Sequence, residues 1–300
     1  MNFADLLRFL RSLPDAVRRV ELLQQSVGHL QQAVGRIEER QLRNVKSSGL
    51  SDYEFKVHSQ WGEDGIIQFL IRRVPIARPI FVEFGVQDYT EANTRFLLTN
   101  NNWSGLVLDG SAEAIASIQR EPIYWRHHLK AAQAFVTREN INALIESHGL
   151  SGEIGLLSVD IDGVDYFVWE AITVVQPALV IVEYNARFGP ERAVTVPYDA
   201  AFQRSRAHHS NIYYGASLAA LVGLGKKKGY AFVGSNSAGN NAFFVRRDLL
   251  PADLRERTAR DGFVDGKFRE ARDENGRLTF LDAAQEKALL ATLPLVEVEP

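Results

Sequence analysis

The chain has 300 residues, a formal net charge of −3 and 46% hydrophobic residues, which is typical of one large globular domain with an appendage. The small net charge gives no reason to expect binding to nucleic acid. Because the chain has no cysteine, disulfides, thiolate metal sites and a cysteine nucleophile are excluded. No apolar run approaches the roughly 18 residues of a membrane-spanning helix, and we expect no secretion signal. These features favour a cytoplasmic protein.

The first 45 residues carry a heptad pattern. Apolar residues recur in steps of three and four at Leu6, Phe9, Leu13, Ala16, Val20, Leu23, Val27, Leu30, Val34 and Ile37. This pattern predicts a coiled-coil helix that runs to about Leu42, with Ser12 as its cap and Pro14 in its first turn. The stripe would also suit a two-helix core, but no second matching helix follows before the strands, so we expect a homo-oligomer.

The start of this segment allows another interpretation. Residues 3–13 are mostly apolar and carry Arg8 and Arg11, and such a helix could lie on a membrane surface. Two arginines make only a small electrostatic contribution. We keep the inner face of a membrane as an alternative location.

The centre of the prediction is a strand, a tight turn and a helix. Residues 81–84 are apolar apart from Glu83, Gly85 follows, and a helix-like stretch begins at Glu91. Gly85 would let a ligand approach the backbone. A second apolar run ends at Asp109, where an acid commonly binds the ribose hydroxyls of a nucleotide-like cofactor.

A polar and aromatic stretch precedes this first strand. Residues 44–52 form a polar linker, and residues 59–65 read SQWGEDG before an apolar helix. Acids in a first helical turn favour the helix dipole, so capping alone would explain Glu63. Because the stretch is more elaborate than a cap requires, we predict that Gln60 and Glu63 form a lid over the cofactor.

Two further strands end in polar residues. The strand at 154–159 ends at Asp160 and Asp162, and the strand at 177–182 ends at Glu183 and Asn185. Strands that alternate with helices form a parallel sheet, whose ligands lie at the carboxyl ends of the strands. After a helix at 218–228, two strands at 229–234 and 241–245 are close enough to form an antiparallel hairpin.

This arrangement resembles the S-adenosylmethionine-dependent methyltransferase fold, a class I, Rossmann-like α/β sheet with an antiparallel C-terminal hairpin. Four stretches resemble FkbM-type and related methyltransferases of sugar and polysaccharide clusters: residues 59–65, 81–85, 160–163 and 241–245. The resemblance covers roughly residues 53–248. It implies three parts, which are a helical segment (1–45), a methyltransferase domain (46–250) and a C-terminal extension (251–300) without recognisable chemistry.

The resemblance also implies a cofactor and its contacts. S-adenosylmethionine would have its methionine half beside Glu83 and Gly85 and its ribose on Asp109. In one departure, Tyr89 stands where many of these enzymes have a glycine. The carboxylate of the methionine half would then fall to Asn93 or Thr94 at the start of the next helix.

A sugar hydroxyl needs a base or a divalent metal to become a nucleophile. Four residues offer hard oxygen ligands that suit Mg²⁺ or Mn²⁺: Asp160, Asp162, Glu183 and Asn185. The base could be Asp162, Asp165 or one of the pair His208 and His209. Of these we expect Asp160, Glu183 and Asn185 to be the metal ligands and Asp162 or His209 to be the base. The competing interpretation is that Asp160 and Asp162 only cap the helix that begins near Phe167 and orient the cofactor amine. The need for a metal stays open.

The expected activity is therefore methyl transfer from S-adenosylmethionine to a hydroxyl of a sugar or polysaccharide. A non-catalytic coiled-coil assembly protein with a ligand-binding domain is one alternative, and docking to a polysaccharide-assembly partner is compatible with either. A nucleotide-sugar oxidoreductase would need the full Gly-x-Gly-x-x-Gly fingerprint, which the chain lacks. We expect no nucleic-acid partner.

Overall fold

The computed structural model describes residues 3–47 and 49–300, and for residues 3–13 and 21 it describes the backbone alone. The chain divides into two compact units, residues 1–45 and 46–300. Each unit is described by itself below. No described helix is both long and apolar enough to cross a membrane.

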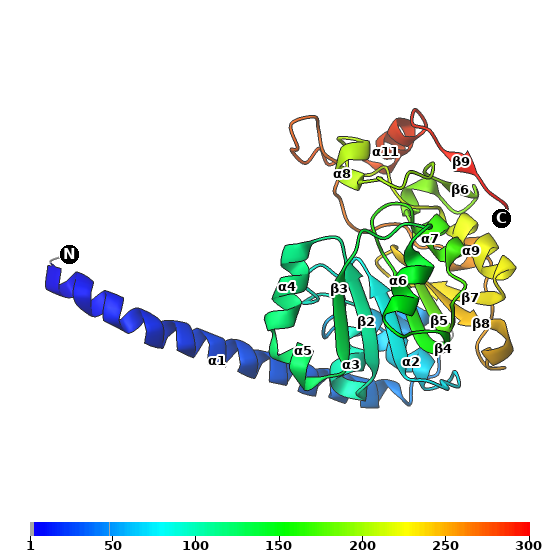
Figure 1. Ribbon diagram of the computed structural model, residues 1–300. Coiled ribbons are helices and arrows are strands. Elements are labelled where there is room, and N and C mark those ends of the chain that lie inside the picture. The colour runs from blue at the N-terminus through cyan, green and yellow to red at the C-terminus, as the bar shows by residue number, and fades with distance from the viewer. Residues whose placement is uncertain (1–2, 48) are drawn as a thin grey trace. The chain divides into compact units, whose positions relative to one another are not determined.

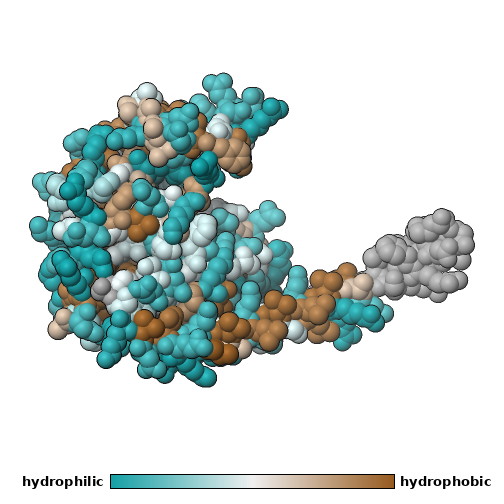
Figure 2. All heavy atoms as spheres, turned by 180° about the vertical axis from the view of Figure 1, so that it is seen from behind, coloured by the Kyte–Doolittle hydropathy of each residue, from teal (hydrophilic) through white to brown (hydrophobic). Residues whose placement is uncertain are grey.

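The first unit is the helix α1 (Phe3–Leu42). It continues through Pro14, so the prediction that it begins there is wrong. At 40 residues it is about 60 Å long. Its apolar stripe is solvent-exposed, because the side chains at 20, 23, 27, 30, 34 and 37 are each 51–65% exposed, and Figure 2 shows apolar residues gathered along the helix. The expectations for Leu6, Phe9 and Leu13, and for residues 3–13 on a membrane surface, concern side chains outside the described residues.

The second unit is built on a seven-stranded sheet (Figure 1). Its strands are β1 (Ile80–Phe84), β2 (Ser104–Asp109), β3 (Leu129–Gln133), β4 (Gly152–Val159), β5 (Val175–Glu183), β7 (Tyr230–Ser235) and β8 (Asn241–Arg246). They lie in the order β3-β2-β1-β4-β5-β8-β7. The first five strands pair in parallel, and β8 is antiparallel to both of its neighbours. The predicted fold class, a mostly parallel α/β sheet closed by an antiparallel hairpin, is confirmed.

The hairpin enters the sheet by its second strand. β8 pairs with β5, and β7 takes the outer edge. Because β8 runs antiparallel to β5, its first residue lies beside the last residue of β5, and Asn241 pairs with Glu183. Sequence pattern predicted the hairpin but gave no sign of this insertion, which brings the hairpin turn to the carboxyl edge of the parallel strands.

The helices and short elements of this unit are η1 (Leu50–Tyr53), α2 (Glu63–Ile71), α3 (Arg95–Asn101), α4 (Ala112–Arg120), α5 (Pro122–Arg126), α6 (Ile141–Ser147), α7 (Asp165–Ala171), η2 (Ala186–Phe188), α8 (Arg204–Ala207), α9 (Leu218–Lys227), η3 (Arg247–Leu249), α10 (Ala259–Gly262) and α11 (Ala283–Leu290). Alternate strand residues point to opposite faces of the sheet. On one face Val82 and Phe84 join a core cluster with Trp169 of α7 and Leu221 of α9. On the other face Glu83 binds the start of α3.

Residues 251–300 fold into the same unit as the sheet. The Tyr184 hydroxyl, just after β5, donates to the Val264 carbonyl at 2.7 Å, and the Lys267 N–H donates to the Ala238 carbonyl at 3.0 Å. Near the end of the chain, β9 (Val296–Glu297) pairs antiparallel with β6 (Val194–Thr195). The segment therefore packs along the carboxyl edge of the sheet, where parallel α/β sheets bind ligands.

Candidate active site

The polar strand ends meet on one face of one edge of the sheet. Glu83 of β1 pairs with Ser158 of β4, and Ser158 pairs with Ile181 of β5. Side chains two residues apart on a strand share a face, so Asp160 and Glu183 follow on the same side as Glu83. The convergence predicted from the strand ends is present.

Gly85 is held in a conformation and a contact that only glycine accepts. Its φ is +72°, and a Cβ atom at this position would lie 1.7 Å from the Asp160 carbonyl oxygen. Its N–H donates to the Leu108 carbonyl at 3.0 Å. The turn after β1 is thus packed against the turn after β4, with no room for a side chain at position 85.

Tyr89 replaces the expected glycine without opening the loop. Its φ is +64°, so the backbone keeps the left-handed conformation that a glycine would favour. The side chain is fully buried, and its hydroxyl lies 2.9 Å from Thr94 Oγ1. Thr94 Oγ1 in turn donates to Glu83 at 2.5 Å. A buried ring that supports Glu83 therefore stands where a glycine was expected.

Glu83 is an anchor of this loop. Its Oε1 accepts from the Asn93 N–H at 2.9 Å, and its Oε2 accepts from the Thr94 N–H at 3.1 Å and from the Thr94 hydroxyl. Burial raises the pKa of Glu83 to about 7, although these donors oppose the shift. The two N–H groups predicted to hold the methionine carboxylate are both engaged by Glu83. Asn93 still lines a cavity, whereas Thr94 is fully buried.

Glu63 is also engaged by protein donors. Its Oε2 accepts from the N–H groups of Trp61 and Gly62, both at 2.9 Å. Its Oε1 accepts from the side-chain amides of Asn236 at 2.7 Å and Asn241 at 2.9 Å. The carboxylate therefore ties the predicted lid to the hairpin turn between β7 and β8.

Two adjoining cavities open at this edge. The larger, about 220 Å³, is lined by Asp109, Phe135, Val136 and Ile161 among others. The smaller, about 100 Å³, is lined by Gln60, Glu83, Asn93 and Asn241 among others. Gly85, Gln87 and Asp160 line both. Of the predicted lid residues, Gln60 thus reaches a cavity wall.

Asp109 lines the larger cavity and can accept further hydrogen bonds. Its Oδ2 accepts from the Gln87 N–H and its Oδ1 from the Ser111 N–H, each at 2.7 Å. A carboxylate has about four lone-pair positions, so each oxygen can accept one more hydrogen bond. Beside it, Phe135 and Val136 give the cavity an apolar wall.

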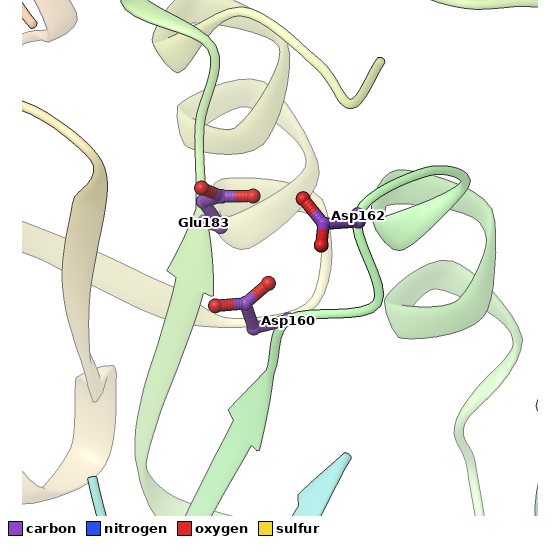
Figure 3. A group of neighbouring side chains, drawn as sticks. All are labelled: Asp160, Asp162 and Glu183. Atoms are coloured by element: carbon purple, nitrogen blue, oxygen red, sulfur yellow. The ribbon is translucent and has the colours of Figure 1, made fainter. Parts of the chain in front are cut away.

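Three carboxylates gather beside both cavities (Figure 3). Asp160 follows β4, Asp162 lies in the loop before α7, and Glu183 ends β5; each offers an oxygen within 4.8 Å of the others. In Figure 3 the three carboxyl groups point toward one another. Burial, and then the neighbouring acids, raise the pKa of Asp160 and of Glu183 well above the usual range.

The cluster is short of hydrogen-bond donors. Among the described residues none donates to the side chain of Asp160 or Glu183, and Glu183 Oε2 is buried without a partner. Asp162, whose side chain is 52% exposed, forms an ion pair with Arg204. The cluster thus contains three carboxylates and one nearby guanidinium. Carboxylate oxygens are hard metal ligands, and such a set fits a divalent cation such as Mg²⁺ or Mn²⁺.

Asp165 shapes the loop that carries the cluster. It is the first residue of α7, and its carboxylate accepts from the Ile161 N–H at 2.8 Å and the Gly163 N–H at 3.0 Å. Asp162 between them has a φ of +54°, so its side chain leaves the loop towards the cavity. The helix therefore begins at Asp165, two residues before the predicted start near Phe167, and Asp165 supplies the contacts to the loop N–H groups.

Asn185 and His209 take other positions. The Asn185 amide donates to the carbonyls of Ile212 at 2.9 Å and Tyr214 at 3.0 Å, and its oxygen accepts from the Arg187 N–H at 3.2 Å. Asp162 stands in its place in the carboxylate cluster. His209 is exposed, its ring lies 4.2 Å from that of His208 at an angle of 35°, and it lines neither cavity.

Arg204 is a site residue that sequence pattern did not indicate. It lines the larger cavity, pairs with Asp162 and with Glu270, and lies over the Tyr214 ring with its guanidinium carbon 3.8 Å from the centroid. Glu270 comes from the C-terminal segment, 66 residues away in sequence. A single arginine in a polar stretch carries no signal of such a contact.

No family model and no curated protein matches the chain. Solved structures match it at low identity. The CurJ carbon methyltransferase matches at 10% identity over 61% of this chain and 52% of its own, with a TM-score of 0.39. A putative caffeoyl-CoA O-methyltransferase from Staphylococcus aureus matches at 14% over 61% of this chain and 82% of its own, with a TM-score of 0.39. The N-terminal domain of EvdMO1, solved with SAH and D-fucose, matches at 11% over 70% and 94%, with a TM-score of 0.38.

The chain thus spans about half the length of the solved CurJ carbon methyltransferase chain. These likenesses are too distant to carry a function to this chain. What the site can do follows from its own chemistry. The edge offers a cavity with an acid and an apolar wall, a smaller acceptor-lined cavity, and a carboxylate cluster beside both.

Proposed function

We propose that the protein transfers a methyl group from S-adenosylmethionine to a hydroxyl of a sugar or polysaccharide, with a divalent cation bound at the site. The observation that carries the proposal is the donor-poor cluster of Asp160, Asp162 and Glu183 beside two adjoining cavities. A buried acceptor without a partner is costly unless a ligand supplies one.

The larger cavity suits the nucleoside half of the methyl donor. Asp109 can accept the ribose hydroxyls with the lone pairs that Gln87 and Ser111 leave open. Phe135 and Val136 offer an apolar surface for a purine ring. The smaller cavity then receives the methionine half, because Gly85 and Asp160 belong to both walls.

Asp160 and Glu183 would hold the cation, since each offers a hard oxygen ligand within 4.8 Å of the other, and the Asp162 carboxylate lies within the same distance of both. Such a cation, when bound, lowers the pKa of a coordinated hydroxyl and fixes its position. Gly85 and Asp165 contribute by holding the Asp160–Asp162 loop in place. This support matters because misplaced ligands lose affinity.

The reaction makes simple demands on the residues. The acceptor oxygen attacks the methyl carbon, the carbon–sulfur bond breaks with its electron pair on sulfur, and the hydroxyl proton leaves to a base. We assign that base to Asp162, whose carboxylate is half-exposed at the cavity. Arg204, already paired with Asp162, would hold that carboxylate in position at the cavity wall.

A sugar as acceptor is supported by the sequence resemblance of four stretches to sugar and polysaccharide methyltransferases, two of which (59–65 and 241–245) meet at Glu63 in the folded chain. The alternative of a non-catalytic assembly protein predicts no methyl transfer. A nucleic-acid acceptor would require a basic surface stripe, for which the net charge of −3 gives no support.

Two measurements on the full chain test the proposal. Calorimetric titration with S-adenosylhomocysteine should show one site per chain. Incubation with S-adenosylmethionine, Mg²⁺ and a panel of monosaccharides and nucleotide sugars should release S-adenosylhomocysteine. Binding without turnover across the panel would favour the non-catalytic alternative, and no binding at all would overturn the proposal.

A further inference from the structure

Asn241 lies at the candidate active site and has a buried side-chain oxygen without a hydrogen-bond partner among the described residues. It is the first residue of β8, is 3% exposed, pairs with Glu183 across the sheet and lines the smaller cavity. Its Oδ1 atom is buried, and no described residue donates a hydrogen bond to it. A buried amide oxygen of this kind calls for a partner.

The orientation of this amide follows from Glu63. Asn241 Nδ2 donates to Glu63 Oε1 at 2.9 Å, and a carboxylate can only accept. Turning the amide over would set two oxygens against each other and lose that bond. The oxygen of Asn241 therefore faces away from Glu63, and the free acceptor is a consequence of the network.

The walls of the smaller cavity are rich in acceptors. Glu83 and Asp160 line it together with Asn241. Three oxygen-bearing side chains around about 100 Å³ favour a compact group that donates several hydrogen bonds and carries positive charge. An ammonium group has this chemistry.

We propose that Asn241 Oδ1 accepts a hydrogen bond from the α-ammonium group of the methyl donor, and so selects ligands with an intact amino-acid end. The inference rests on the proposed function, because it takes the methionine half to occupy the smaller cavity. Asn241 is then a binding residue for the donor, supplied by the hairpin strand that inserts beside β5.

The test is a thermodynamic cycle on the full chain, measured by calorimetry. The two ligands are S-adenosylhomocysteine and its analogue with hydrogen in place of the α-ammonium group. The two proteins are the wild type and Asn241→Leu, which has a similar side-chain volume. For each protein we compare the ratio of its affinities for the two ligands. This ratio should favour the amino ligand at least tenfold more in the wild type than in the variant, because the variant loses a hydrogen bond to a charged group.

Asn236 offers a matched control. Its Nδ2 also donates to Glu63 Oε1, at 2.7 Å, but its Oδ1 already accepts from the N–H groups of Gly239, Asn240 and Asn241. Asn236→Ser disturbs Glu63 without removing the unpaired oxygen, so its preference between the two ligands should match the wild type. Asn241→Ser serves where the leucine variant does not fold.

Equal preference in the wild type and the Asn241 variants would overturn the inference while leaving the proposed function intact. A preference lost equally in Asn236→Ser would also overturn it, since it would place the effect in the Glu63 network. If neither ligand bound the wild type, the proposed function itself would fail first.

A second, independent observation concerns α1. Val20, Val27 and Val34 occupy the first core position of successive heptads, and the second core positions are Leu23, Leu30 and Ile37, all more than half exposed. β-branched residues at the first core position with leucine at the second favour two parallel strands.

The flanking charges agree with a parallel pair. In a parallel dimer Arg19 would face Gln24 of a second copy and Ala33 would face Glu38, so no like charges meet. An antiparallel dimer over the same core layers would set Arg19 against Arg40. We infer that the occupant of this stripe is α1 of a second copy, in parallel register.

The absence of cysteine makes this testable by cross-linking. Under mild oxidation, full chains carrying Val20→Cys should form a disulfide-linked dimer, while Gln25→Cys, on the opposite side of the helix, should not. Light scattering of the wild type should give the mass of two 33.6 kDa chains. A monomer mass, or equal cross-linking of both variants, would overturn the inference.

Discussion

Glu83 in β1 and Glu183 in β5 are two buried glutamates on strands that lie either side of β4 in the same sheet, yet their surroundings differ. Glu83 is 4% exposed and Glu183 is 8% exposed. Glu83 accepts three hydrogen bonds from Asn93 and Thr94, whereas no described residue donates to Glu183. The first carboxylate holds a loop, and the second is available to a ligand.

The same division separates the other acids of this edge. Glu63 and Asp165 bind protein N–H groups, as Glu83 does. Asp160 shares the donor-poor cluster with Glu183. Residue type does not distinguish the two groups, but the number of hydrogen-bond donors does. Where donors are missing, the cost of burial has to be offset by a bound group.

The largest expected effect concerns the donor-poor group. We expect Asp160→Asn and Glu183→Gln each to reduce methyl transfer by about 10³-fold or more, because each removes a charged ligand of the cation. The free energy of unfolding should not fall, since removing one buried acid relieves repulsion between neighbours. Release of S-adenosylhomocysteine and urea unfolding measure the two effects.

Glu153 provides the control for these variants. It lies on β4 like the residues that lead to Asp160, but at the opposite end of the strand, where it pairs with Arg246 on the surface. Glu153→Gln should leave turnover unchanged. Near-normal turnover in Asp160→Asn or Glu183→Gln would remove the assignment of the cluster.

The next effect concerns the donor-rich group. Glu83→Ala should lower the free energy of unfolding by about 3 kcal/mol, because two N–H groups and the Thr94 hydroxyl lose their acceptor. Urea unfolding followed by circular dichroism measures the loss. A variant as stable as the wild type would break the comparison, since Glu83 would then not be an anchor.

The pH dependence of stability is a second test of the role of Glu83. The pKa of Glu83 rises from 4.5 in the unfolded chain to about 7 in the fold, so the folded state retains a proton that the unfolded state has lost. Stability from this group is present below pH 4.5 and is lost as the pH rises toward 7. Relative to Glu83→Gln, the wild type should lose about 2 kcal/mol between pH 5 and 6.5. A difference that stays flat, or grows with pH, would contradict the assignment.

The smallest effect concerns Asp109. Both of its oxygens bind N–H groups, but each keeps room for one more donor. Asp109→Asn should weaken the binding of S-adenosylhomocysteine about tenfold through the lost charge-assisted bonds. Its effect on methyl transfer should stay far below that of Asp160→Asn. Unchanged affinity in calorimetry would move the nucleoside away from this cavity.

The sheet and its edge were within reach of the sequence, because short-range patterns determine them. Apolar runs ending in Glu83, Asp109 and Asp160 mark strands whose carboxyl ends must meet in a parallel sheet. The two strands before and after Gly239 are close in sequence, so a local pattern also predicts the hairpin. What remained out of reach was the order in which the hairpin joins the sheet.

The division of labour among the acids could not be predicted, since it depends on distant partners. Glu63 receives donors from Asn236 and Asn241, more than 170 residues along the chain. Arg204 contacts Asp162, 42 residues away in sequence, and Glu270, 66 residues away. Because sequence pattern does not contain these contacts, it could not distinguish the acids that anchor loops from the acids that are available to a ligand.

The predicted metal ligands show the same limit in a small space. Asn185 follows β5 directly, and its amide would suit a cation, but it is turned to the carbonyls of Ile212 and Tyr214. Asp162 enters the cluster because its left-handed backbone turns the side chain toward Asp160. A single dihedral angle decides which residue faces the site, and sequence pattern does not encode it at that precision.

The most direct test is a titration of the full chain with Mn²⁺ in the presence of S-adenosylhomocysteine, followed by the electron paramagnetic resonance signal of free Mn²⁺. The wild type and Glu153→Gln should bind one ion per chain. Asp160→Asn and Glu183→Gln should bind it at least 100-fold more weakly. A wild type that binds no Mn²⁺, or binding that survives both substitutions, would contradict the claim that the donor-poor acids form a cation site.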